Sequence, residues 1–145
     1  MKHQHIRLGR VIRLATATTT LSAILAIPLS SVLVAASPTV LVGSAPLAVA
    51  VNPSTNTVYV TNRVDNSVSV INGSTNTVTA TVSVGSIPLA VAVNPSTNTV
   101  YVANFGGRSV SVINGKNNTV TKTVSVGSLP LAVAVNPSTN TVYVA

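Results

Sequence analysis

The sequence predicts an all-β protein built from repeated four-stranded antiparallel sheets, and three observations support that prediction. A stretch of 42 residues that begins at Val42 is written again from Val84, and its opening twenty residues return at Val126. The two complete copies align without gaps and differ at nine positions. Within each copy, apolar residues alternate with small polar ones in runs separated by turn-forming residues. A period of this length indicates a repeat architecture.

Four runs in each copy have the period-two alternation of a β-strand and are rich in Val, Thr and Tyr. In the first copy these runs are 47–51, 57–60, 67–70 and 77–84. The segments NPSTN, NRVDN and NGSTN between them place Pro, Asn, Asp and Gly in tight turns, and Asn56 suits a left-handed conformation. Turns this short make consecutive strands antiparallel neighbours. Between copies, a Gly followed by a Pro three residues later directs the chain into the next sheet.

Four antiparallel strands in each repeat of roughly 40 residues are typical of a β-propeller blade. We expect the first strand of each unit, LAVAV, to lie innermost, where converging strands favour its alanines. The prediction is a partial propeller of about two and a half blades. It comprises a lone fourth strand at 38–43, blades at 44–84 and 86–126, and a partial blade at 128–145.

The predicted number of blades is too small for a closed propeller ring. Closed propellers use about four to eight blades, and stacked repeats need about three units to bury enough surface. Two and a half blades leave apolar faces and a strand edge open. We therefore interpret the chain as a truncated fragment of a longer propeller. The alternative is a short protein that completes its ring by self-association through the open blade edges.

Residues 1–36 have the pattern of a signal-peptide helix. Met1 to Arg13 carries four bases, and an apolar stretch without acids follows and ends in small residues. We expect cleavage after Ala36, which leaves a domain of residues 37–145 that is secreted, periplasmic or at the cell surface. The alternative is a retained membrane anchor, but the apolar run is shorter than the about 20 residues of a spanning helix and contains Pro28. After cleavage we expect no stable membrane span.

The formal net charge of +7 comes largely from this leader, which holds half of the eight Lys and Arg residues. The others, Arg63, Arg108, Lys116 and Lys122, are scattered through loops and strand ends. Nucleic-acid binders gather bases on one face, often beside aromatic side chains. We therefore expect no nucleic-acid partner. The chain has no cysteine, which excludes disulfides and thiolate metal ligands.

The residues after the leader lack the side chains of common catalytic sites. They include no His, no Cys, no Glu and a single Asp, Asp65. Paired carboxylates, a Ser/His/Asp relay and a zinc or haem ligand set cannot be assembled from them. The sequence therefore predicts a non-enzyme with no cofactor, metal ligand or catalytic residue. We expect Tyr59 and Tyr101 to pack in mid-strand with satisfied hydroxyls.

The positions where the copies differ indicate candidate contact loops. RVDN at 63–66 becomes FGGR at 105–108, and Ser-Thr at 74–75 becomes Lys-Asn. Loops on a rigid scaffold commonly carry recognition, and an exposed Phe105 beside two glycines suits a contact surface. The candidate interaction residues are Arg63, Asp65, Phe105, Arg108 and Lys116. The alternatives are free drift of solvated turns and, for Asp65, a hydrogen bond to the local backbone. Asn72 and Asn117 lie in glycosylation sequons, which matter only in a host that glycosylates exported proteins.

The residues YVTN at 59–62 and YVAN at 101–104 lie within a frame of VGxxPLAVAVNP, TVYV, SVSVIN and TVT. From Val42 onwards this frame resembles the YVTN family of β-propeller repeats. The resemblance implies a propeller fold and an exported location, as in surface-layer and secreted proteins, and it transfers no active site. It implies a non-catalytic module that binds a protein or a cell-envelope glycan or has a structural role in the envelope. The alternative is the N-terminal fragment of a quinoprotein dehydrogenase-like or lactonase-like propeller enzyme whose active site lies outside this chain.

Overall fold

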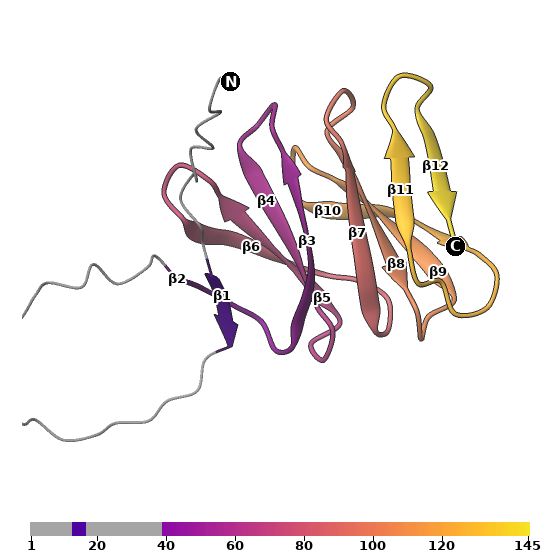
Figure 1. Ribbon diagram of the computed structural model, residues 1–145, viewed down its shortest axis with the longest axis horizontal. Helices are drawn as coiled ribbons and strands as arrows, with labels where there is room; N and C mark the ends of the chain where they lie inside the picture. The colour runs from indigo at the N-terminus through magenta and orange to yellow at the C-terminus, as the bar shows by residue number, and fades with distance from the viewer. Residues whose placement is uncertain (1–12, 17–38) are drawn as a thin grey trace, which may run out of the picture.

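The computed structural model describes residues 13–16 and 39–145, in which all regular structure is β-strand. Two four-stranded antiparallel sheets follow one another, and a two-stranded sheet follows them (Figure 1). The first sheet comprises β3 (Pro46–Asn52), β4 (Thr57–Asn62), β5 (Ser67–Asn72) and β6 (Thr77–Ser83). The second comprises β7 (Pro88–Asn94), β8 (Thr99–Asn104), β9 (Ser109–Asn114) and β10 (Thr119–Ser125). The last comprises β11 (Val133–Asn136) and β12 (Thr141–Val144). The predicted all-β partial propeller is confirmed.

A fourth, two-stranded sheet precedes the first blade. Its strands, β1 (Arg13–Thr16) and β2 (Thr39–Val42), are parallel, with Arg13 opposite Thr39 and Thr16 opposite Val42. β2 is the lone strand expected before the first blade. β1 falls within the predicted signal-peptide helix, and these four residues are extended. The rest of that segment lies outside the described residues. In the described parts, no helix is long and apolar enough to cross a membrane.

The blades stack through their inner strands. β3 lies against β7, and β7 lies against β11, so the first strands of successive blades are neighbours, as the small residues of LAVAV predict. Because both of their faces are covered, by the second blade and by β2, the middle strands of the first blade are buried over most of their length. In β4 the residues from Tyr59 to Asn62 are all buried, and in β5 so are those from Ser67 to Ile71.

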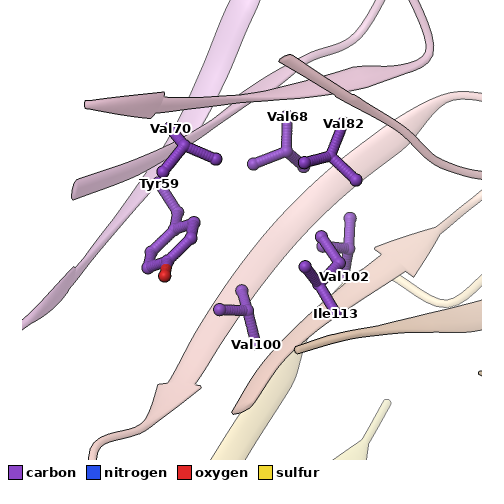
Figure 2. Close-up of a cluster of buried hydrophobic side chains, with 7 residues drawn as sticks. All are labelled: Tyr59, Val68, Val70, Val82, Val100, Val102 and Ile113. Carbon is purple, nitrogen blue, oxygen red and sulfur yellow. The ribbon is translucent and has the colours of Figure 1, made fainter. Parts of the chain in front are cut away.

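One hydrophobic core joins the two complete blades (Figure 2). The first blade contributes Tyr59, Val68, Val70 and Val82, and the second contributes Val100, Val102 and Ile113. Burial of each such side chain stabilises the fold by about 1.5–3 kcal/mol. A smaller cluster on the other face of the first blade combines Val40 of β2 with Val60 and Ile71. Packing between blades, not within one sheet, therefore holds the array together.

The turns use left-handed residues where the sequence predicted them, with one difference. Asn56 has φ 49° and Asn98 has φ 50°, in line with the tolerance of Asn for this region. In the connectors between blades, the left-handed residue is the one before proline, Ala45 (φ 52°) or Ile87 (φ 54°), and no described glycine has a positive φ. The connector glycines Gly43 and Gly85 are needed because a Cβ there would overlap the side chain of a buried asparagine.

The ladder between the first two strands of a blade differs between the copies, beside the position where one has Thr61 and the other Ala103. In the first blade the pairing shifts between Pro46 and Val49, and the backbone N–H of Ala48 donates to the hydroxyl of Thr61 at 2.9 Å. In the second blade the pairing shifts between Pro88 and Ala90, and the equivalent residue, Ala103, pairs directly with Ala90. At the shift in the first blade, the Thr61 hydroxyl and not a backbone carbonyl therefore accepts the hydrogen bond from Ala48 N.

Candidate functional site

The turns that differ most between the copies lie at the same end of the blades as the connectors. In each antiparallel sheet the second strand ends where the fourth strand ends, because both run in the same direction. The turns 63–66 and 105–108 therefore lie beside the connectors 43–45 and 85–87. We call these four segments the variable end. The turns 53–56 and 73–76 lie at the opposite end of the first blade.

Hydrogen bonds make the variable end one continuous surface. Arg63 N donates to Ala45 O at 3.0 Å, and Phe105 N donates to Ile87 O at 2.9 Å. The link between blades is Asn66, whose side-chain Oδ1 accepts from Ile87 N at 2.8 Å. Each turn is therefore bonded to its own connector, and the first turn is also bonded to the connector of the next blade.

A buried asparagine supports each turn from below. Asn62 Nδ2 donates to the hydroxyls of Ser67 at 3.0 Å and Ser69 at 2.9 Å. Asn104 makes the same two bonds in the second blade, at 3.1 Å and 2.9 Å. Both asparagines are fully buried, and the Oδ1 of each accepts no hydrogen bond from the described residues. Sequence reasoning did not assign this role to the last residue of YVTN and YVAN, although its recurrence was visible.

The connector glycines are required by these asparagines. A Cβ added to Gly43 would lie 2.7 Å from Asn62 Cγ, and one added to Gly85 would lie 2.6 Å from Asn104 Cγ. No carbon approaches so closely in a relaxed structure. At Gly127 nothing lies within 4 Å, since no described residue takes the place of Asn104 there.

Four of the five predicted interaction residues lie at the variable end. Arg63, Asp65 and Arg108 are exposed there. Phe105 is half-buried, so the expectation of an exposed ring was wrong. Its backbone bond to the connector holds this turn against the sheet. Lys116 is exposed in the turn between β9 and β10, at the opposite end of the blade.

Asp65 bonds to the connector and not to its own turn. Its Oδ2 accepts from Ser44 N, 21 positions earlier in the chain, at 2.6 Å. The alternative of a purely local hydrogen bond was therefore wrong. This bond engages the one acidic side chain of the sequence. The second blade has Gly107 at this position, and there Gly106 N and Gly107 N both donate to Ser86 O at 3.0 and 3.1 Å.

At two of the differing positions, one in the connector and one in the turn, the larger residue is in the turn in the first blade and in the connector in the second. The first blade combines a small connector residue, Ala45, with a large turn residue, Val64. The second combines Ile87 with Gly106, and a Cβ added to Gly106 would lie 3.0 Å from Ile87 Cδ1. The isoleucine side chain therefore occupies the space beside the glycine. The connector residue and the turn residue thus differ together between the two blades.

Arg108 stands where the other tight turns have asparagine. Its φ is 49°, whereas the left-handed residue of each other described turn within a sheet is an asparagine: Asn56, Asn66, Asn76, Asn98, Asn118 or Asn140. An arginine side chain cannot accept a hydrogen bond. It therefore cannot make the bond that Asn66 makes to the next connector.

No three His, Cys, Asp or Glu residues gather among the described residues. Burial raises the pKa of Tyr59, whose hydroxyl has no hydrogen-bond partner in the described part of the chain. The expectation of a satisfied hydroxyl was therefore wrong for Tyr59. Its mid-strand packing is confirmed (Figure 2).

A cavity of about 320 Å³ lies between the second blade and β12. Its lining is apolar and comprises Tyr101, Val110, Val112, Val124, Val126, Val142 and Val144. All seven are one period of 42 residues away from residues that form the core between the complete blades or pack against it. At that core Ile113 of β9 fills the centre. We therefore interpret the cavity as the counterpart of that core and not as a ligand site.

The fold defines this chain as a β-propeller protein. Residues 15–144 match the family of YNCE-like beta-propellers, and the chain belongs to that family. The match begins inside the segment that the sequence predicted as a signal peptide. No curated protein sequence matches the chain.

Solved structures with a similar fold come from several organisms. Hydrazine synthase of Kuenenia stuttgartiensis is 31% identical with a TM-score of 0.67, and the match covers 72% of this chain and 30% of that one. A functionally unknown protein from Desulfotomaculum acetoxidans is 22% identical with a TM-score of 0.61, covering 69% and 34%. Apo AztD from Citrobacter koseri is 19% identical with a TM-score of 0.52, covering 62% and 26%. The matches thus span about a third or less of these proteins.

Proposed function

We propose that this chain is a non-catalytic binding module of the YVTN, surface-layer or secreted type. It is exported to the periplasm or cell surface and presents its variable end to a protein or a cell-envelope glycan. One observation carries the proposal. Five of the nine differences between the copies, at position 45/87 and across 63–66/105–108, lie at the variable end.

The frame beneath these positions stays constant. The buried Asn62 and Asn104, the serines that they bond and the glycines above them are the same in both blades. A scaffold that is kept while its exposed turns change is the usual arrangement of a recognition surface. The size exchange between connector and turn supports the proposal, because each blade has its own fitted turn.

A second candidate is a segment of a larger propeller enzyme. The likeness to hydrazine synthase favours it, because this chain corresponds to under a third of that protein. The coding sequence beyond residue 145 discriminates between the two functions. Further blades with His, Glu or a CxxCH haem motif support the enzyme, and further blades followed by an anchor support the surface module.

A turn exchange tests the binding function directly. The first variant replaces FGGR at 105–108 by RVDN and Ile87 by Ala, which copies the first blade and keeps the packing matched. The control replaces Lys116 by Ser and Asn117 by Thr, which copies the first blade at the opposite end. Both variants and the native chain are applied to a glycan array and to purified cell-wall polysaccharide.

We expect the native chain and the control to bind the same ligands, and the turn-exchange variant to lose them. An unchanged profile in the turn-exchange variant contradicts a binding role of the variable end. A native chain that binds nothing and stays in the cytoplasm of the expressing bacterium contradicts the whole proposal.

A further inference from the structure

Arg108 occupies a position for which arginine is poorly suited. Left-handed backbone costs a residue with a Cβ about 1–2 kcal/mol, and Asn is among the few that tolerate it. In the first blade Asn66 also bonds Ile87 N at 2.8 Å. Arg108 has the same φ, 49° against 50°, and gives up that bond. Strain of this kind persists where a side chain has a role.

The side chain of Arg108 makes no compensating contact within the described structure. It is exposed, and it forms no hydrogen bond or ion pair with the described residues. Arg63, at the first position of the equivalent turn, is also exposed and likewise without such a partner. Each blade therefore presents one unpaired guanidinium at the variable end.

Neither guanidinium forms an ion pair in the described structure, although Asp65 lies in the same turn as Arg63. The only acidic residue in the sequence, Asp65, is engaged by Ser44 N at 2.6 Å. The bonds from Asn66 to Ile87 and from Phe105 to Ile87 place the two turns on one continuous surface. A guanidinium without an internal partner binds carboxylates and phosphates well, often through two parallel hydrogen bonds.

Phe105 adds an apolar element beside the charge. The ring is half-buried, in the same four-residue turn as Arg108, and the residues between them are two exposed glycines. These glycines have no positive φ, so backbone conformation does not require them. Both glycines are exposed, so no side chain of this turn stands between the ring and the guanidinium, and a flat and partly apolar group such as a sugar ring can approach there.

From these features we propose that the variable end binds an acidic polysaccharide, a polymer whose sugar rings carry carboxylates. Arg63 and Arg108 bind carboxylates of the polymer, and Phe105 contacts a sugar ring beside Arg108. Arg63 is the first residue of its turn and Arg108 the last, so a polymer that carries a carboxylate on each sugar ring can contact both. The inference rests on the proposed binding function and names the chemical class of its ligand.

The test uses polygalacturonate as the probe and its methyl ester as the matched ligand, which keeps the sugar rings and removes the charge. Binding to the full chain is measured by isothermal titration calorimetry. The variants are Arg108→Asn, Arg63→Ser, Phe105→Ala and, as the charge-matched control, Lys116→Ser. Lys116→Ser removes one positive charge at the opposite end and restores the residue of the first blade.

We expect the native chain to bind the acid and not the ester. Arg108→Asn and Arg63→Ser each lower the affinity at least fivefold and weaken its dependence on salt. Phe105→Ala lowers the affinity and leaves the salt dependence unchanged, and Lys116→Ser changes the affinity less than twofold. Circular dichroism confirms that each variant is folded.

Three results overturn the inference. They are no binding of polygalacturonate, equal binding of the ester, or an equal loss in Lys116→Ser and Arg108→Asn, which indicates attraction by net charge alone. If the turn-exchange variant described above still loses a neutral ligand, the binding function stands and only the acidic class is wrong.

Discussion

Asn52 of the first blade donates from Nδ2 to Oδ1 of Asn98 on the second blade at 2.8 Å. Asn94 and Asn140 form the same bond at the next interface, again at 2.8 Å. Asn52 and Asn94 are fully buried, so loss of the acceptor would leave a buried donor without its protein partner. The first and last residues of NPSTN thus act as donor and acceptor of a joint between neighbouring blades.

Loss of the acceptor should weaken this joint. Asn98→Gly keeps the left-handed backbone, at φ 50°, and leaves Asn52 Nδ2 buried without a partner. We expect a loss of about 1–3 kcal/mol in the free energy of unfolding, measured with urea. Asn118→Gly is the control, because Asn118 is also left-handed and its buried Oδ1 has no partner among the described residues. Equal losses in the two variants contradict the interblade role.

A connector glycine should tolerate a methyl group only where the asparagine beneath it is missing. Gly85→Ala places a Cβ 2.6 Å from Asn104 Cγ, and we expect a loss of about 1–3 kcal/mol from overpacking. Gly127→Ala meets nothing within 4 Å and should change stability by less than about 0.5 kcal/mol. Urea unfolding of the two variants in parallel checks the difference. A harmless Gly85→Ala shows that the asparagine moves aside easily.

The size exchange at the variable end predicts coupling between two positions. Gly106→Val alone drives a side chain into Ile87 and should cost about 1–3 kcal/mol. Adding Ile87→Ala rebuilds the combination of the first blade and should recover more than half of that loss. A double-mutant cycle on unfolding free energies measures the interaction. Strictly additive effects contradict the fitted packing.

The buried hydroxyl of Tyr59 predicts a dependence of stability on pH. Burial raises its pKa in the folded state above the ordinary value of 10.0. The unfolded chain therefore loses this proton first, and the contribution is full below pH 10.0 and falls as the pH rises through the folded pKa. Tyr59→Phe removes the effect, so the native chain should lose stability faster than the variant above that pH. Urea unfolding on both sides of pH 10.0 measures this, and parallel slopes refute it.

Arg108→Asn should stabilise the chain while it weakens ligand binding. Asparagine relieves roughly 1 kcal/mol of left-handed strain and places an acceptor near the next connector. The reverse substitution, Asn66→Arg, should destabilise the chain, because it adds the strain and removes the bond to Ile87 N. Thermal unfolding of both variants checks the opposite signs. A stabilising Asn66→Arg would show that this position does not discriminate between the two residues.

Much of the fold could be predicted because period-two alternation and a period of 42 residues are properties of the sequence itself. The boundaries of the strands follow the turn residues closely, and the left-handed Asn56 follows from the chemistry of asparagine. The variable end was also accessible, since disagreement between copies marks exposed turns. Four of five candidate residues lie there, and only the placement of Lys116 needed the antiparallel topology.

The remainder depends on contacts that one sequence does not reveal. The joint from Asn52 to Asn98 connects residues 46 positions apart, and nothing local distinguishes it from a turn. The parallel pairing of Arg13 with Thr39 depends on a segment whose composition favours a helix. The exposed fraction of Phe105 depends on how its turn is bonded to the connector. Ordinary local rules therefore describe the blades, while the interfaces between them need coordinates.

The joint between blades has an evolutionary consequence. Because one five-residue turn supplies the donor for one neighbour and the acceptor for the other, an in-frame duplication of a single unit creates a compatible interface at once. No new surface has to be selected before the added copy can dock. Lengthening or shortening of such an array by recombination is thus tolerated structurally, and selection is free to act on the exposed turn that each new copy brings.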